Sequence, residues 1–360
     1  MTATHDLHAL GQSLWLDNIT RPMLDSGTLA RYIGELDVTG LTSNPTIYDK
    51  AIGGSDAYDD AVRSSVEAGA SPEQTFFELA IADLVRAADL FRPAHAASGG
   101  VDGFVSLEVS PLIAYDSATT LTDAKRLHAQ AGRDNLFIKI PGTPEGLVAI
   151  EEAIFASVPI NVTLLFSPRQ YVACAEAYTR GIERRVAAGL DPFVPSVASL
   201  FISRWDAAVT DRVPADLALK LGLAVGGAAY AEYVAFYGTP RWQALLAKGA
   251  KPQRLLFAST GTKDPTASET LYIDGLAAPD TVNTMPEETL LGLAESDVAI
   301  EPLPTDGAAA RAMLARFEEA GISIDGLGLE LQQKGAAAFV KSWESLMTRV
   351  TEKAAAVTSA

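Results

Sequence analysis

Short apolar runs alternate with helical segments along most of the chain. Several of the runs alternate between apolar and polar positions, which is typical of β-strands, and the segments between them follow the period of amphipathic helices. The pattern predicts strands over residues 13–19, 40–44, 103–109, 135–140, 160–166, 192–198, 254–259 and 280–285, with 298–300 as a rival for the last place.

The intervening segments predict helices, and two of them have clear start signals. Ser71-Pro72-Glu73 supplies an N-cap followed by proline at the first helical position, and Ser167-Pro168 repeats the arrangement. We expect helices over residues 28–35, 71–88, 120–132, 146–156 and 169–188, more than one helix in 202–250, and a helical tail over 308–358 that Gly326-Leu327-Gly328 interrupts.

Eight strand–helix units without a linker predict an α/β fold, a single (β/α)8 TIM barrel. We expect residues 1–360 to form one domain, with additional helices and with 308–360 as a C-terminal helical extension. The alternative is a doubly wound sheet, which usually has a glycine-rich turn after its first strand. Thr20-Arg21-Pro22 stands at that place, so the barrel is favoured.

Lys139 lies within the apolar strand 135–140, which Pro141 and Gly142 end. Burying an ammonium group costs several kcal/mol unless it is paired or deprotonated. One interpretation is an edge-strand lysine that guards against aggregation. The other is a Schiff-base lysine, whose free amine attacks a carbonyl from a desolvated pocket.

Strand alternation distinguishes these interpretations. In a barrel, one set of side chains faces the helices, the other faces the lumen, and active sites form at the carboxyl ends of the strands. In the first, second, third and fifth strands the mainly aliphatic set matches the helix-facing side. The other set carries polar groups near the strand ends, so the side chains expected at one mouth are Asp17, Asn44, Glu108, Lys139, Asn161 and Thr163.

These residue types support one chemistry. A lysine amine attacks a ketone, and the resulting iminium is an electron sink that permits cleavage of a neighbouring carbon–carbon bond. One carboxylate takes the proton from the hydroxyl that becomes an aldehyde. A second acid–base group moves protons while the carbinolamine forms and breaks down.

Four segments resemble the transaldolase family, in its longer bacterial branch, in order and spacing over roughly residues 12–290. They read VTGLTSNPT at 38–46, IKIP at 138–141, NVTLLFS at 161–167 and SLFISR at 199–204. The resemblance implies a pentose phosphate pathway enzyme. It would transfer a dihydroxyacetone unit from fructose 6-phosphate or sedoheptulose 7-phosphate to glyceraldehyde 3-phosphate or erythrose 4-phosphate, without a metal or organic cofactor.

The resemblance also assigns roles. Lys139 is the expected Schiff-base residue, Asp17 the acid–base at the cleaved bond, and Glu108 acts through a water that Thr163 helps to hold. The expected contacts to the dihydroxyacetone hydroxyls come from Asn44, Asn161 and Ser199. Phe201 stands where transaldolases carry phenylalanine and the aldolase relatives carry tyrosine.

The expected phosphate site departs from the better-known members. They carry an arginine two residues after the serine that ends the seventh strand, and Gly261 follows Ser259 at that distance here. Arg204 is retained. We expect Lys263 and the backbone amides of the loop that begins at Ser259 to complete the phosphate clamp.

Composition narrows the remaining possibilities. A net charge of −17 argues against a nucleic-acid or anionic-membrane surface. The single Cys174 fits a reducing compartment and looks structural, and the four histidines show no metal-ligand spacing. No signal peptide or membrane span is apparent, so we expect a cytoplasmic protein that binds phosphorylated sugars as a monomer or homodimer.

Two alternatives stay open at this point. One is an enzyme like fructose 6-phosphate aldolase, and the other is a non-catalytic barrel that binds sugar phosphates. The last helical segment, 329–357, could cover the barrel mouth or a neighbouring subunit.

Overall fold

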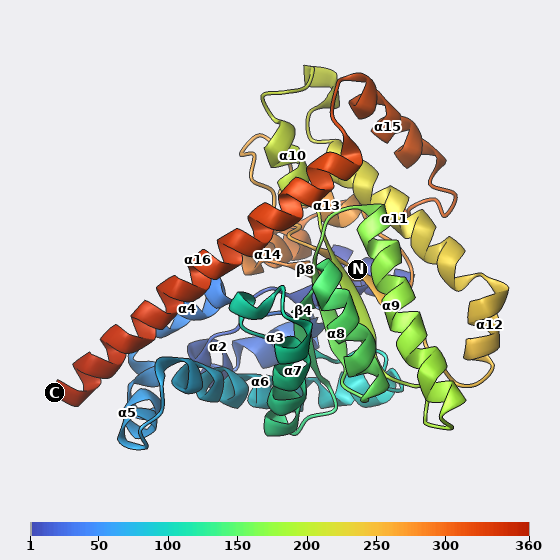
Figure 1. Ribbon diagram of the computed structural model, residues 1–360. Coiled ribbons are helices and arrows are strands. Elements are labelled where there is room, and N and C mark those ends of the chain that lie inside the picture. Colours follow the sequence, from blue (N-terminus) through green and yellow to red (C-terminus); the bar gives the residue numbers. More distant parts are fainter. Residues whose placement is uncertain (1, 360) are drawn as a thin grey trace.

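The computed structural model describes residues 2–359, which form eight parallel strands surrounded by helices (Figure 1). The strand order is β2-β1-β8-β7-β6-β5-β4-β3, as a (β/α)8 barrel requires. The predicted TIM barrel is therefore confirmed. The strands are β1 (Ser13–Leu16), β2 (Val38–Leu41), β3 (Val105–Glu108), β4 (Leu136–Pro141), β5 (Ile160–Leu165), β6 (Ser196–Phe201), β7 (Arg254–Ala258) and β8 (Val282–Met285).

The barrel closes between β2 and β3, where no strand ladder is assigned within residues 2–359. The backbone N–H of Leu41 donates to the carbonyl of Phe104 at 2.9 Å, and the Ser43 hydroxyl donates to the carbonyl of Ser106 at 2.8 Å. Gly40 permits this approach, because a Cβ there would lie 2.6 Å from the Phe104 carbonyl oxygen. We call this contact the β2–β3 seam.

Helices follow most strands, and their starts match the sequence signals. Ser71 and Ser167 both form complete capping boxes. The helices that follow or connect the strands are α1 (Ala3–Leu10), α2 (Arg21–Asp25), α3 (Thr28–Glu35), α4 (Pro45–Gly53), α5 (Asp59–Glu67), α6 (Pro72–Ala97), α7 (Ser117–Ala131), α8 (Pro144–Phe155), α9 (Pro168–Ala187), α10 (Ser203–Val209), α11 (Leu221–Tyr237), α12 (Pro240–Leu246), α13 (Leu271–Asp274) and α14 (Glu287–Glu295), with short 3₁₀ turns at Asp56–Tyr58, Pro111–Ile113 and Ala215–Leu217.

Several predicted boundaries are wrong. The second strand is 38–41 rather than 40–44, because Asn44 already caps α4. The sixth is 196–201 rather than 192–198, since the prolines at 192 and 195 lack the N–H that a ladder needs. Residues 298–300 are not a strand, and helix α1 was not predicted.

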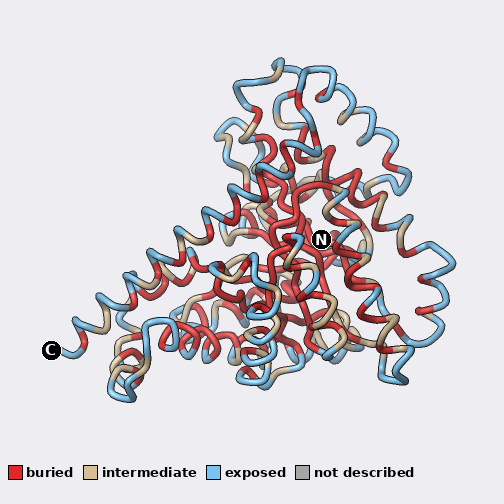
Figure 2. Tube along the Cα trace, viewed as in Figure 1, coloured by how far each residue is buried: buried red, intermediate tan, exposed pale blue. Residues whose placement is uncertain are grey.

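The C-terminal segment forms two helices, α15 (Ala308–Glu319) and α16 (Ile324–Ser359). The predicted break at Gly326-Leu327-Gly328 is wrong, because these residues lie inside α16 and the chain turns instead at Gly321, whose φ is 85°. Figure 1 shows α16 as a long red helix that crosses one end of the barrel, and Figure 2 shows its buried and exposed faces alternating. It packs mainly on α4 and α5 and also contacts β5, so it covers the mouth of its own barrel. That all 360 residues form one domain stays a prediction.

The strands hold the most deeply buried residues (Figure 2). At the amino end of the lumen, Phe104 and Phe137 stack with ring centroids 4.0 Å apart, and Trp15 packs beside Phe137. Asp102 next to them accepts hydrogen bonds from Ser13 Oγ at 2.5 Å and Trp15 Nε1 at 2.9 Å. This end of the lumen is filled, so a ligand can enter only at the other end.

Strand β4 lies between β3 and β5, so the edge-strand interpretation of Lys139 is wrong.

None of the helices formed by residues 2–359 combines the length and apolarity that crossing a bilayer requires.

Candidate active site

Lys139 lies near the carboxyl end of β4 with its side chain in the lumen. Its Nζ donates to the Ser43 carbonyl at 2.9 Å and lies 3.3 Å from Glu108 Oε2. The side chains of Lys139 and Glu108 are only 7% and 5% exposed. Strand pairing explains the contact, because Glu108 on β3 is in register with Lys139 on β4. The amine is therefore buried, paired with one carboxylate, and directed at the β2–β3 seam.

Asp17 follows β1 directly and supplies the second acid. Its Oδ1 accepts a hydrogen bond from Thr42 Oγ1 at 2.7 Å, and Thr42 also contacts Thr284 Oγ1 at 2.8 Å. Burial raises the pKa of Asp17, with Lys139 acting in the opposite direction. Burial likewise raises the pKa of Glu108, again against the influence of Lys139. Two carboxyl groups with raised pKa values beside one buried amine are typical of acid–base sites.

The polar residues of β5 and β6 are bonded to each other. Ser199 Oγ donates to Asn161 Oδ1 at 2.7 Å, and Asn161 Nδ2 donates to Ser106 Oγ at 3.1 Å. Thr163 is fully buried, and its Oγ1 has no hydrogen-bond partner among the described residues. The same holds for Glu108 Oε1. Because buried polar atoms are almost always paired, these two oxygens are candidates for contact with a substrate or water.

Asn44 has a structural task as well as a place at the mouth. Its side-chain oxygen caps α4 by accepting from the N–H of Ile47 at 3.1 Å. The cap fixes the orientation of the amide, so its Nδ2 is the group left to donate to a ligand.

Two cations stand further out. The Arg204 guanidinium stacks on the Phe201 ring, with Cζ 5.2 Å from the centroid, and within residues 2–359 no carboxylate forms a salt bridge with it. Burial lowers the pKa of Arg204. Lys263 is exposed on the loop after β7. The loop begins at Ser259, which has a left-handed φ of 56° and shares a hydrogen bond with Ser203 Oγ at 3.0 Å.

The structure also accounts for Gly261, which stands where better-known members carry arginine. Gly261 is buried, and a Cβ added there would lie 2.9 Å from Pro286 Cγ. An arginine side chain does not fit this backbone without a shift, so any second cation has to come from elsewhere on the loop.

A cavity of about 350 Å³ joins these groups. All of the predicted site residues line it except Glu108 and Asn161, which lie directly beneath it through their contacts with Lys139 and Ser199. Sequence reasoning did not assign Thr42, Thr46, Lys50, Thr284 or Phe339 to the site. Strand alternation does not single out Thr284, because in β8 each face carries one polar and one apolar residue. Phe339 belongs to α16, and no sequence motif identifies it as a site residue.

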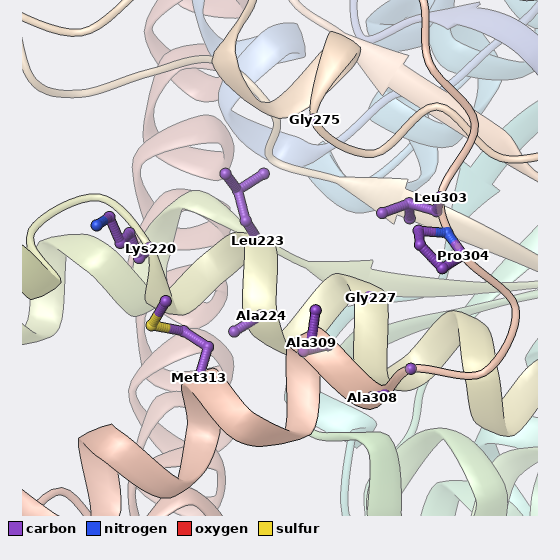
Figure 3. Close-up of a pocket in the computed structure, with 12 residues that line it drawn as sticks. Lys220, Leu223, Ala224, Gly227, Gly275, Leu303, Pro304, Ala308, Ala309 and Met313 are labelled. Atoms are coloured by element: carbon purple, nitrogen blue, oxygen red, sulfur yellow. The ribbon is translucent and has the colours of Figure 1, made fainter.

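A second cavity, of about 240 Å³, lies between α11, α15 and the chain before α15 (Figure 3). Its lining is almost entirely apolar, with Leu223, Leu303 and Met313 among the larger side chains. Lys220 at its edge already donates to the Asp216 carbonyl. Few polar groups line this cavity, so the first one is the candidate active site.

Comparison with known proteins agrees with this geometry. The sequence model of the family described as Transaldolase/Fructose-6-phosphate aldolase matches residues 14–350. The chain belongs to this family. The transaldolase family match extends beyond the segment of roughly 12–290 that carries the motifs, and it takes in most of α16.

Curated transaldolases match almost end to end. The transaldolase of Thermobifida fusca is 43% identical, over 97% of this chain and 97% of the relative. The transaldolase of Saccharopolyspora erythraea is 41% identical, over 98% and 99%. A protein named transaldolase 2 from a Nostoc species is 39% identical, over 97% and 96%.

Proposed function

We propose that this protein is a transaldolase of the pentose phosphate pathway that works through a Schiff base on Lys139. The donor would be sedoheptulose 7-phosphate or fructose 6-phosphate, and the acceptor glyceraldehyde 3-phosphate or erythrose 4-phosphate. The observation that carries the proposal is the buried Lys139 amine, 3.3 Å from Glu108, at the base of a cavity that Arg204 and Lys263 also line.

The first step is attack of the lysine on the donor ketone. Only the neutral amine is a nucleophile, so Lys139 must give up a proton. Glu108 is in contact with Nζ, and its raised pKa makes it a better proton acceptor than an ordinary carboxylate. Attack gives a carbinolamine, which loses water to form the iminium.

Thr163 and Glu108 support the loss of water. Thr163 Oγ1 and Glu108 Oε1 are both buried without a hydrogen-bond partner among residues 2–359, and residues 163 and 139 lie on paired strands. We infer that a water held between them carries the proton to the leaving hydroxyl and returns during hydrolysis.

Asp17 is the base for carbon–carbon cleavage. It takes the proton from the hydroxyl that becomes the aldehyde, and Thr42 fixes its orientation. The electron pair of the broken bond moves into the iminium and leaves an enamine on Lys139. The enamine carbon then attacks the carbonyl carbon of the acceptor aldehyde, and Asp17 returns the proton to the oxygen that becomes a hydroxyl.

The remaining residues bind the substrate. Asn44 Nδ2, Ser199 Oγ and Asn161 are proposed to contact dihydroxyacetone hydroxyls. Ser199 Oγ donates to Asn161 Oδ1 and so would accept from the substrate, whereas the second Nδ2 proton of Asn161 is left to donate to it. Arg204, Lys263 and the Ser259 loop are proposed to hold the phosphate, because a cation without an acidic partner at the mouth is suited to a dianion.

The chemistry needs no metal or organic cofactor, since the iminium itself accepts the electrons. We further propose a cytoplasmic enzyme that is a monomer or homodimer and has no nucleic-acid or membrane partner, in line with its net charge of −17.

Borohydride trapping tests the mechanism. With fructose 6-phosphate and borohydride, the protein should gain one dihydroxyacetone-sized mass, and peptide mapping should place it on Lys139. Lys263 and Lys50, which line the same cavity, are internal controls. Label on either of these, or no label, would contradict the Schiff-base assignment and favour a barrel that only binds sugar phosphates.

Phe201 separates transfer from the aldolase alternative. Its ring lies between Phe166, Phe339 and Arg204 and offers no hydrogen-bond donor to activate water. We expect transfer to erythrose 4-phosphate to be much faster than release of free dihydroxyacetone, and Phe201→Tyr to raise release and lower transfer. A wild type that releases dihydroxyacetone as fast as it transfers it would be an aldolase.

A further inference from the structure

Helix α16 places one buried polar side chain against the strand ends that carry the site. Gln332 is 4% exposed, and its Nε2 donates to the Gly142 carbonyl at 3.0 Å and to the Leu164 carbonyl at 2.9 Å. Both partners are acceptors, so only the amide nitrogen can serve them, and both of its protons are used. Gln332 therefore bridges the ends of β4 and β5.

These ends are next to the proposed chemistry. Gly142 follows Lys139 by three residues, and Leu164 directly follows Thr163. The Gly142 N–H in turn donates to the Thr163 carbonyl at 2.7 Å. The peptide before Leu164 is thus held by Gly142, and the peptide after it is held by Gln332.

Leu164 has an unusual backbone that needs such support. Its φ is 59°, and the pairing of β5 with β6 shifts register between Val162 and Leu165. A left-handed backbone is unfavourable by about 1–2 kcal/mol for a residue with a side chain, and it persists only where the surroundings hold it. A bulge of this kind re-aims the neighbouring side chains.

The helix is fitted to this bulge at a second point. Gly335 lies about one turn after Gln332, and a Cβ there would be 2.9 Å from Leu164 Cδ2. Gly335 therefore lets α16 approach closely enough for the Gln332 amide to reach the Leu164 carbonyl.

We propose that Gln332 is a positioning residue for the Schiff-base steps. By holding the bulge at Leu164, it keeps the Thr163 hydroxyl directed at the cavity that Lys139 occupies. The inference rests on the proposed function, in which Thr163 helps to hold the water that serves formation and hydrolysis of the iminium. Through Gln332, helix α16 would influence the reaction by holding the backbone at Leu164.

The first test is Gln332→Met, which keeps the length of the side chain and removes both donors. We expect kcat to fall about 10- to 100-fold, as small displacements of catalytic groups cause elsewhere. The rate of borohydride trapping should fall in parallel, and KM for fructose 6-phosphate should stay unchanged because Arg204 and Lys263 are untouched. Gln333→Met is the matched control, since Gln333 is the adjacent glutamine and is exposed.

A double mutant separates positioning from general loss of structure. If Gln332 acts through Thr163, then Gln332→Met with Thr163→Val should lose no more activity than Thr163→Val alone. Losses that multiply would overturn the proposal, and so would a Gln332→Met that behaves like Gln333→Met. A wild type that traps no donor would overturn the proposed function and this inference with it, whereas a normal wild type beside an unaffected Gln332→Met overturns the inference alone.

Gln332→Glu provides a second variant that remains polar. Only a protonated carboxyl can donate to a carbonyl, and it offers one proton where the amide offers two. The activity of Gln332→Glu relative to the wild type should therefore rise as pH falls. A ratio that is constant with pH would contradict a role for the donated hydrogen bonds.

Discussion

The two ends of the barrel lumen use polar residues in opposite ways. At the amino end, Asp102 accepts from Ser13, Trp15 and the Gly103 N–H, and Arg254 Nη2 completes the network by donating to Ser13 at 2.8 Å. At the carboxyl end, Glu108 Oε1 and Thr163 Oγ1 are equally buried and have no partner among the described residues. A closed network stabilises the fold, whereas an open one leaves groups for a substrate to complete.

The largest effect should come from the carboxyl end. Lys139→Ala should lower the transfer rate by at least about four orders of magnitude, because removing a nucleophile removes the covalent route. Steady-state assay with fructose 6-phosphate and erythrose 4-phosphate measures this. Lys220→Ala is the control, since Lys220 lies at the edge of the second cavity and should keep full activity. Retained transfer in Lys139→Ala would end the Schiff-base mechanism.

Stability should show the reverse pattern. Asp102→Ala leaves three buried donors without an acceptor and should lower the free energy of unfolding by roughly 3–5 kcal/mol. Thr163→Val removes a hydroxyl that has no hydrogen-bond partner in the part of the chain that the structure describes, so stability should be unchanged or rise slightly while activity falls. Denaturant unfolding of both variants measures the contrast. Equal destabilisation would show that Thr163 is structural and that the two ends do not differ.

The next largest effect should come from Arg204 and Lys263, through the affinity for phosphorylated donors. Arg204→Ala and Lys263→Ala should each raise KM for phosphorylated donors by a factor that corresponds to about 2–3 kcal/mol, as expected for a charge-assisted contact. Dihydroxyacetone donors without a phosphate should be almost unaffected. Equal damage with both types of donor would mean that these residues support the fold.

The pH dependence is the most subtle effect. Burial raises the pKa values of Asp17 and Glu108, so each stays protonated to a higher pH than a free carboxyl group, whose pKa is about 4. If the reaction needs the carboxylate form, activity should therefore already decline at pH values above that ordinary pKa as the pH is lowered. The acid limb of kcat/KM reports this. A limb at the ordinary carboxyl pKa would place the base outside the buried site.

The sequence predicted the barrel and the convergence of the site because both depend on local alternation. Strand alternation placed Glu108, Lys139 and Thr163 at one level without any knowledge of neighbouring strands. It could not show that Asn161 is bonded to Ser106 and Ser199, since these contacts join side chains of different strands.

The contribution of α16 could not be predicted for a similar reason. Phe339 and Gln332 look like ordinary positions of an amphipathic helix, and only tertiary packing brings them to the mouth of the barrel. The left-handed backbone at Leu164 is also hidden, because neither glycine nor asparagine marks it.

The β2–β3 seam is where we expect the barrel to open locally most often. Elsewhere neighbouring strands share a ladder of paired residues, but here the Leu41 N–H to Phe104 contact takes the place of a ladder. Amide hydrogen exchange at Leu41 should consequently be faster than at Ile138 in the centre of β4. Lys139 adds a contact across the gap, since its Nζ reaches from β4 to the Ser43 carbonyl. When the amine becomes an iminium it has fewer protons to donate, so its contact with the Ser43 carbonyl weakens. Amide hydrogen exchange at the seam should therefore be faster in the iminium form than in the free enzyme.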